Sequence, residues 1–309
     1  MRKKIRRLQR LLYILLVCLQ SVVVTTGRFC WLAFARRSGK LDDRCGELTV
    51  AAHQRLSRRL LAILGITVVA MPEQSGTVER GNRLLVSNHL SYLDVLVISS
   101  VYPTRFVGKR EVAGWPLIGW LARLGGTIFL ERGNVRSSVR GVYQVSRLLR
   151  AGQQVHVFPE GTTTNGEAVA TIHPLFCVAA VRSERPILPL TVRVEEVQED
   201  GQASERPHEI LAWYGEMTFL EHLWRLLLID AARIQLLTHD EISVGRADRA
   251  LGLASRLEAT LSSGLTEVDA HADDGLNWSL DLVAGAILFS RFVTPGNQTT
   301  QEIFRLSEE

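Results

Sequence analysis

The sequence predicts an α/β fold in which helices flank a largely parallel central sheet, preceded by a separate helix or helix pair at the N-terminus. From residue 48 onward, short apolar runs of strand length alternate with helical patterns, which is typical of a layered domain with parallel strands. The 309 residues can bury a sizeable core in one large domain with appendages. The first forty residues differ sharply in composition from the rest.

The difference is one of charge. Residues 1–40 contain ten Lys or Arg and no Asp or Glu, so the remainder carries −6 against a total of +4. This acidic body argues against a nucleic-acid-binding protein, although the pI is near 9.0. Basic charge beside an apolar run is instead typical of a membrane-surface anchor.

The N-terminal segment, residues 1–44, admits three interpretations. Residues 11–27 form a charge-free run of 17 residues, at the short limit for a spanning helix. A spanning helix must end before Arg28 or bury it, at a cost of about 2.5–3.5 kcal/mol at the membrane centre. A cleaved signal peptide is disfavoured by the aromatic residues beside Ala33-Phe34-Ala35. Basic residues on both flanks favour an anchor that lies in the plane of one leaflet.

The remaining elements follow from periodicity and turn residues. We expect strands at residues 66–70, 84–86, 105–108, 127–130, 154–158, 187–194, 210–214 and 234–237. We expect helices at residues 48–64, from the end of the second strand to 101, and at 116–124, 137–150, 175–181, 220–228 and 246–261. The folded domain would then cover residues 45–264, followed by a tail, residues 265–309, without a functional interpretation. The four cysteines show no disulfide or metal-site spacing.

A histidine and a carboxylate stand five positions apart directly after the second strand, in Asn88-His89-Leu90-Ser91-Tyr92-Leu93-Asp94. Ser91 and Asp94 also have the spacing of a helix capping box, and the two interpretations are compatible. Asp94 in the first helical turn would orient the imidazole and fix its tautomer. His89 Nε2 would then remove a proton from a hydroxyl group.

Three further motifs are weaker when taken singly. Arg132 follows the strand 127–130 at the edge of the sheet, where a guanidinium can bind phosphate or simply face solvent. Phe158-Pro159-Glu160-Gly161-Thr162 forms a strand-to-loop turn in which backbone and hydroxyl groups can approach a ligand. Pro186 and Pro189 disfavour a central position in a sheet and indicate a strand entry at the rim of a site.

Together, in this order and at these distances, the four motifs resemble the glycerolipid acyltransferase family, which includes the 1-acylglycerol-3-phosphate acyltransferases. The resemblance covers about residues 45–240. It implies transfer of a fatty acyl group from acyl-CoA or acyl carrier protein to the hydroxyl of a lysolipid, without metal or bound cofactor. It implies that His89 and Asp94 are catalytic, and that the substrate-binding residues are Asn88, Ser91, Gly126, Arg132, Glu160, Gly161, Thr162 and Pro189.

One departure leaves the acceptor open. Thr163 stands where phosphatidate-forming members often carry Arg. The Thr-Thr-Asn-Gly continuation is more similar to members that acylate lyso-ornithine lipid or lysophospholipids with larger heads. The resemblance places such an enzyme on the cytoplasmic face of a bacterial inner membrane, in contact with membrane lipids and not with nucleic acid. Two other hypotheses are a lipid-binding protein without turnover and a hydrolase that uses water as the acceptor.

Two further patterns have no assigned role. One face of the predicted helix 137–150 carries Arg140 and Arg147, and Arg136 extends this face at the start of the helix. Such a face suits either contact with an anionic lipid surface or exposure to solvent. The apolar stretch Trp115–Trp120 suits either the membrane interface or core packing.

Overall fold

The computed structural model describes residues 2–35, 42–71, 82–266 and 276–277. Its sheet has the order β4-β3-β5-β2-β6-β8-β1-β9, with β7 paired to β6. The strands are β1 (Ile66–Met71), β2 (Leu84–Ser87), β3 (Arg105–Lys109), β4 (Ile128–Leu130), β5 (Val155–Val157), β6 (Ile187–Glu199), β7 (Gln202–Ala203), β8 (Ala231–Thr238) and β9 (Leu276–Asn277).

The pairing confirms the predicted α/β class. All contacts among β2, β3, β4 and β5 are parallel, as are those of β2 with β6 and β1 with β8. β6 pairs antiparallel with β8 and β7, and β1 pairs antiparallel with β9. The parallel half of the sheet therefore brings the carboxyl ends of β2 and β5 to one edge, where ligands bind in open α/β sheets.

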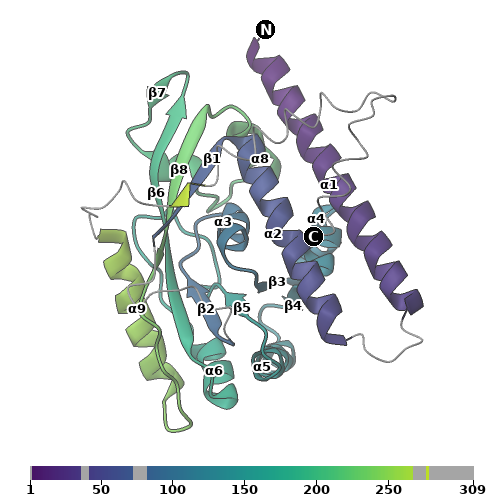
Figure 1. The fold of residues 1–309 in the computed structure, drawn as a ribbon. Coiled ribbons are helices and arrows are strands. Elements are labelled where there is room, and N and C mark those ends of the chain that lie inside the picture. Colours follow the sequence, from purple (N-terminus) through teal and green to yellow (C-terminus); the bar gives the residue numbers. More distant parts are fainter. Residues whose placement is uncertain (1, 36–41, 72–81, 267–275, 278–309) are drawn as a thin grey trace.

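Helices cover both faces of the sheet (Figure 1). One core contains side chains of α2 (Asp42–Leu64), α3 (Leu93–Val101), α7 (Pro207–Leu211) and α8 (Phe219–Leu226). The other contains side chains of α5 (Val135–Arg150), α6 (Cys177–Ser183) and α9 (Ala250–Thr266). The remaining short helices are η2 (Arg110–Gly114), α4 (Ile118–Leu124) and η3 (Pro174–Phe176).

The N-terminal segment is one long helix, α1 (Arg2–Ala35), which lies beside α2 (Figure 1). Its segment Ile5–Gly27 is long and apolar enough to cross a membrane. Residues three or four apart on one side of it, Leu11, Ile14 and Cys18, pack on the domain. The opposite side exposes Leu8, Leu12, Leu15, Leu16, Leu19 and Val23.

Basic residues attach the start of α1 to the domain. Arg6 pairs with Asp230 and donates to the carbonyl of Leu228. Arg10 Nη1 donates a 2.6 Å hydrogen bond to the carbonyl of Ile229. The helix therefore packs on the domain along one side and exposes an apolar strip on the other.

Two expectations from the sequence are wrong. Residues 210–214 do not form a strand, because Pro207 starts α7 there, as proline commonly does at the first helical position. Pro189 lies inside β6, between β2 and β8, and not at a strand entry. Pro189 precedes the first β6–β8 pair, Leu190 with Thr238. The backbone N–H that proline lacks is therefore missing just before the pairing of β6 with β8 begins.

The other predicted elements agree with the structure within a few residues, with three exceptions. α2 starts six residues earlier than the predicted position 48, and β6 and α9 each end five residues later than predicted. The proposed boundary after residue 44 falls inside α2. The tail, residues 265–309, lies outside the described residues except for the end of α9 and β9.

Candidate active site

His89 lies two residues beyond the end of β2, and its imidazole contacts Asp94 of the following helix. The distance between Nδ1 and Asp94 Oδ2 is 2.8 Å. The same carboxylate oxygen accepts from the backbone N–H groups of Leu90 (2.7 Å) and Ser91 (2.9 Å). Because an ionised carboxylate can only accept, Nδ1 carries the proton and Nε2 presents a lone pair. No described group forms a hydrogen bond with Nε2.

The pair formed by His89 and Asp94 is partly accessible to solvent. The His89 side chain is 17% exposed, whereas that of Asp94 is 4% exposed. Asp94 is therefore held in the protein interior by three donors, while the imidazole reaches the surface. This arrangement suits a base whose orientation is fixed from behind and whose free nitrogen can meet a substrate.

The loop after β5 holds the backbone of His89 on both sides. Glu160 Oε1 accepts from the His89 N–H at 2.7 Å, and the carbonyl of His89 accepts from the Thr164 N–H at 2.9 Å. The second Glu160 oxygen accepts from the Ala170 N–H at 2.8 Å. The two strongest sequence motifs are thus joined at the histidine itself.

Glu160 is buried, with 4% of its surface exposed. Burial raises the pKa of Glu160 to about 7, opposed by the hydrogen bonds from Ala170 and His89, and the Asp94 carboxylate adds to the rise. The resemblance places Glu160 among the substrate-binding residues. Since each of its two oxygens accepts a backbone N–H, from His89 and from Ala170, we propose that Glu160 braces the site.

Aromatic packing fixes the plane of the imidazole. The ring of Phe158 stacks on that of His89, with 3.7 Å between centroids and 15° between planes. His156 lies edge-on to Phe158 at 4.4 Å and bonds Ser87 Oγ through Nε2 at 3.0 Å. Burial lowers the pKa of His156 well below its usual value, with His89 adding to the shift, so His156 is a neutral packing residue.

Asn88 and Ser91 shape the loop around His89. The Asn88 side chain accepts from Val192 N (2.8 Å) and donates to Val192 O (2.9 Å), which extends the contact between β2 and β6. Ser91 Oγ accepts from the Leu93 N–H at 3.3 Å, at the start of α3. Both residues are buried. We therefore propose positioning roles for them in place of direct substrate contacts.

The expected Gly126 and Arg132 lie at opposite ends of β4. Arg132 is exposed at the carboxyl edge, the edge where His89 lies. Gly126 precedes the strand, has φ +73°, and would place a Cβ 2.0 Å from Arg105 Nη1. Gly126 is thus needed for the close approach of Arg105, and the structure does not bring it to the site.

Of the other residues expected to bind substrate, two are exposed near the site and one is buried in the sheet. Gly161 and Thr162 are exposed in the loop that follows Glu160, and Gly161 has φ +70°. Pro189 is buried opposite Val86 of β2. Gly161 and Thr162 therefore remain candidates for contact with substrate, whereas Pro189 supports the strand beneath His89.

An aromatic group flanks the helix that carries Asp94. The Tyr92 ring lies 4.9 Å from that of Phe219 and 5.7 Å from that of Trp213, and Trp115 lies 5.2 Å from Phe219. Trp120, by contrast, is 56% exposed. The two interpretations of the stretch Trp115–Trp120 thus apply to different residues: Trp115 packs and Trp120 faces outward.

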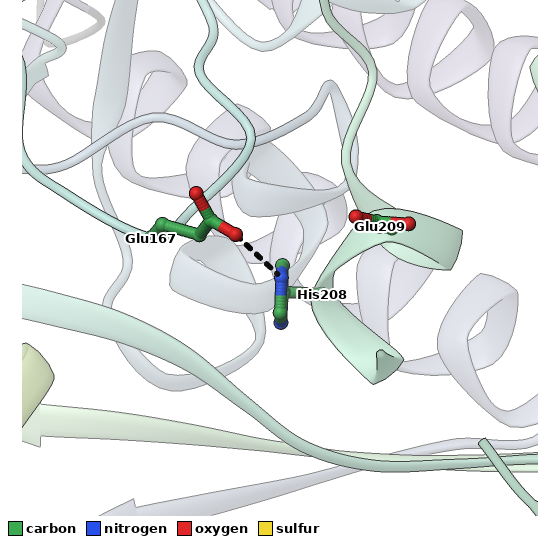
Figure 2. Close-up of side chains that lie close together, drawn as sticks. All are labelled: Glu167, His208 and Glu209. Carbon is green, nitrogen blue, oxygen red and sulfur yellow. Dashed lines mark ion pairs between the residues drawn. The ribbon is translucent and has the colours of Figure 1, made fainter. Parts of the chain in front are cut away.

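Among the residues that the structure describes, one group of side chains has potential metal ligands. Figure 2 shows Glu167 facing His208, with Glu209 beyond. Their ligand atoms lie within 4.8 Å of one another. Each carboxylate already has a protein partner: Asn165 donates to Glu167 at 2.8 Å, and Arg206 pairs with Glu209 at 3.0 Å. His208 Nε2 lies 3.7 Å from Glu167 Oε1, so this group links the loop after Glu160 to α7.

Three features of the site were not predicted from the sequence. These are the stacking of Phe158, the brace formed by Glu160 and Thr164, and the clamp formed by Asn88. One signal was available for Glu160, because an acidic residue is a poor ligand for an anionic acceptor. The others depend on contacts between residues distant in the sequence.

Comparisons with known proteins agree on the family. Residues 69–193 match the family model described as Acyltransferase. A lyso-ornithine lipid O-acyltransferase of Pseudomonas aeruginosa is 30% identical over 229 residues, covering 74% of this chain and 83% of that protein. A 1-acyl-sn-glycerol-3-phosphate acyltransferase of Neisseria meningitidis is 30% identical over 217 residues, covering 68% and 80%.

The fold also has a solved counterpart. The crystal structure of the 1-acyl-sn-glycerophosphate acyltransferase PlsC from Thermotoga maritima matches with a TM-score of 0.60 and 20% identity. The match covers 87% of this chain and 98% of that one. With the identity and coverage of the relatives above, these findings show that the chain is an acyltransferase enzyme and belongs to the glycerolipid acyltransferase family.

Proposed function

We propose that this enzyme transfers a fatty acyl group from a thioester, acyl-CoA or acyl carrier protein, to the free hydroxyl of a lysolipid. The observation that carries the proposal is the 2.8 Å contact of His89 Nδ1 with Asp94, which leaves Nε2 free on a partly exposed ring. The relatives that are lysolipid acyltransferases by name support the choice of acceptor.

In the proposed reaction, His89 Nε2 takes the proton from the acceptor hydroxyl as its oxygen attacks the thioester carbonyl. Asp94 stabilises the imidazolium that forms. When the tetrahedral intermediate collapses, the carbon–sulfur bond breaks and the imidazolium returns its proton to the departing thiolate. The products are an ester and a free thiol, and the imidazole is restored. Glu160 and Phe158 hold the ring in place throughout.

The acceptor is a lysolipid whose head carries an anionic group, for which 1-acylglycerol-3-phosphate is the first candidate. Arg132 is proposed to bind that head, from an exposed position at the carboxyl edge of β4. Lyso-ornithine lipid is the second candidate, favoured by Thr163 in place of an arginine and by the relative from Pseudomonas aeruginosa.

The apolar helix and the bacterial relatives indicate membrane association. We propose that α1 lies in the plane of the cytoplasmic leaflet of the inner membrane. A helix that crossed the bilayer would have to leave the domain, but Arg6, Arg10 and the packed side of α1 attach it there. Its exposed leucine strip is suited to the acyl boundary of a leaflet.

Labelled acyl donor, added to membranes with and without lysolipid, tests the proposal. Product formation that depends on added lysolipid supports transfer. Release of free fatty acid without lysolipid would show a hydrolase, and binding without any product would show a lipid-binding protein. Supplying 1-acylglycerol-3-phosphate and lyso-ornithine lipid in separate reactions distinguishes the two acceptors.

A further inference from the structure

The outward side of α5 combines exposed apolar and basic residues. Val135, Val139 and Tyr143, spaced four apart, are 76%, 61% and 58% exposed. Residues with this spacing form one stripe along a helix. Arg136, Arg140 and Arg147 are exposed as well and flank the stripe. From Val135 to Arg147 the stripe is about 18 Å long.

The positive charge on this surface is not balanced locally. α5 contains no Asp or Glu. Within the described chain, none of these three guanidinium groups forms an ion pair. Arg150, at the end of the helix, donates to the carbonyl of Arg182, another exposed basic residue of the next helix. The surface therefore attracts an acidic partner with an apolar contact region.

The layers of the fold separate this surface from the membrane anchor. α5 packs with α6 and α9 in one core, whereas α1 and α2 contribute to the cores on the other face of the sheet (Figure 1). A bilayer that covers the exposed strip of α1 thus faces a different side of the molecule. A partner dissolved in water fits the α5 surface better than an anionic membrane does.

The start of α5 lies near the edge that carries the active site. Its cap residue, Asn134, follows two positions after Arg132, at the carboxyl end of β4. His89 lies at the same edge of the sheet, beyond β2. The first turns of α5, which carry Val135, Arg136 and Val139, therefore lie at the edge of the sheet that carries the site.

We propose that this α5 surface, made of Val135, Arg136, Val139, Arg140, Tyr143 and Arg147, docks an acidic acyl carrier protein that delivers the acyl thioester. The inference rests on the proposed function, because it names the donor for that reaction. Of the two thioester donors, only a carrier protein has a protein surface that can cover a stripe of this length. Opposite charge would raise the rate of encounter and set the orientation of the carrier.

The test compares two donors that carry the same acyl chain, acyl carrier protein and acyl-CoA, with the full-length enzyme in detergent. In Arg136→Ser/Arg140→Ser, we expect the KM for acyl carrier protein to rise about tenfold, with kcat unchanged and the KM for acyl-CoA unaltered. The matched control is Arg249→Ser/Arg256→Ser, which removes two exposed charges at and within α9. This control should change neither KM.

Several results would overturn the proposal. An unchanged KM for acyl carrier protein, or an equal rise for both donors, would remove the docking site. Loss of binding to anionic vesicles, with an unchanged KM for the carrier, would assign α5 to the membrane. If the wild-type enzyme used acyl-CoA alone and did not bind the carrier, the docking site would be refuted while the proposed function stood.

A binding measurement separates failure of the docking site from failure of the function. Titration of acyl carrier protein into wild-type and variant enzyme reports docking without turnover. Tight binding that is lost in Arg136→Ser/Arg140→Ser, in an enzyme that transfers from neither donor, would support the surface and refute the proposed reaction.

Discussion

The backbone N–H of His89 donates a 2.7 Å hydrogen bond to Oε1 of Glu160, so the residue proposed as base is held by a carboxylate 71 positions later in the chain. The other oxygen of Glu160 binds the N–H of Ala170. One buried side chain therefore connects the loop after β2 with two parts of the loop after β5.

Replacing Glu160 by Ala leaves two backbone N–H groups without their acceptor. Each unsatisfied buried group costs about 1–3 kcal/mol, so we expect a clear fall in the melting temperature together with reduced kcat. Thermal unfolding and steady-state kinetics measure the two effects. Glu167→Ala changes an exposed carboxylate in the same loop and should leave both quantities near wild type. Equal effects of the two substitutions would contradict the bracing role.

The raised pKa of Glu160 predicts a pH dependence of stability. The carboxyl titrates near 7 in the folded protein and near its usual 4.5 when unfolded. Between these values the folded state binds more protons, so the free energy of unfolding falls as pH rises, by about 3 kcal/mol in all. Melting curves between pH 4.5 and 8 should show this fall in wild type, and a smaller one in Glu160→Gln. Identical slopes would contradict the prediction.

Phe158→Leu removes the ring that stacks on His89. Because an aromatic pair contributes about 0.5–1.5 kcal/mol beyond buried area, we expect kcat to fall about three- to tenfold as the imidazole gains freedom. The KM for either substrate should change little. Steady-state kinetics at saturating donor and acceptor provide the measurement. A change confined to KM would show that Phe158 contacts a substrate instead.

Arg132→Ala should chiefly raise the KM for the lysolipid acceptor. A guanidinium that binds the anionic head stabilises the enzyme–acceptor complex and the transition state equally, so its loss weakens binding. The strand order places β4 three strands, about 14 Å, from β2, so kcat should be less affected. Arg123→Ala, an exposed arginine on α4 at the other end of β4, is the control. An acceptor KM equal to that of the control would remove Arg132 from the head-group site.

The sequence predicted the elements that depend on local signals. The strand before His89, the helix after it and the parallel half of the sheet follow from periodicity and from turn residues. The segment 210–214 shows the limit, since its apolar alternation indicates a strand while Pro207 begins a helix. Pro189 shows another, because its tolerance inside β6 depends on where β8 ends.

In the candidate site, too, contacts between residues close in the sequence were predictable and contacts between distant residues were not. The contact between His89 and Asp94 spans five residues and could be inferred from spacing. The brace from Glu160 and the clamp from Asn88 to Val192 span 71 and 104 positions, and a single sequence carries no signal for such pairs. The resemblance linked Gly126 to the site through its motif. In the structure, the absence of a side chain at Gly126 leaves room for the side chain of Arg105.

The role of His89 as general base is tested most directly by the turnover number of His89→Ala, measured with saturating acyl donor and lysolipid. We expect a fall of at least about a hundredfold, since general base catalysis contributes about 10²–10⁴-fold, with the melting temperature and vesicle binding retained. His173→Ala, an exposed histidine of the neighbouring loop, should keep normal turnover. A His89→Ala enzyme that retained near-wild-type kcat would contradict the proposed role of the imidazole.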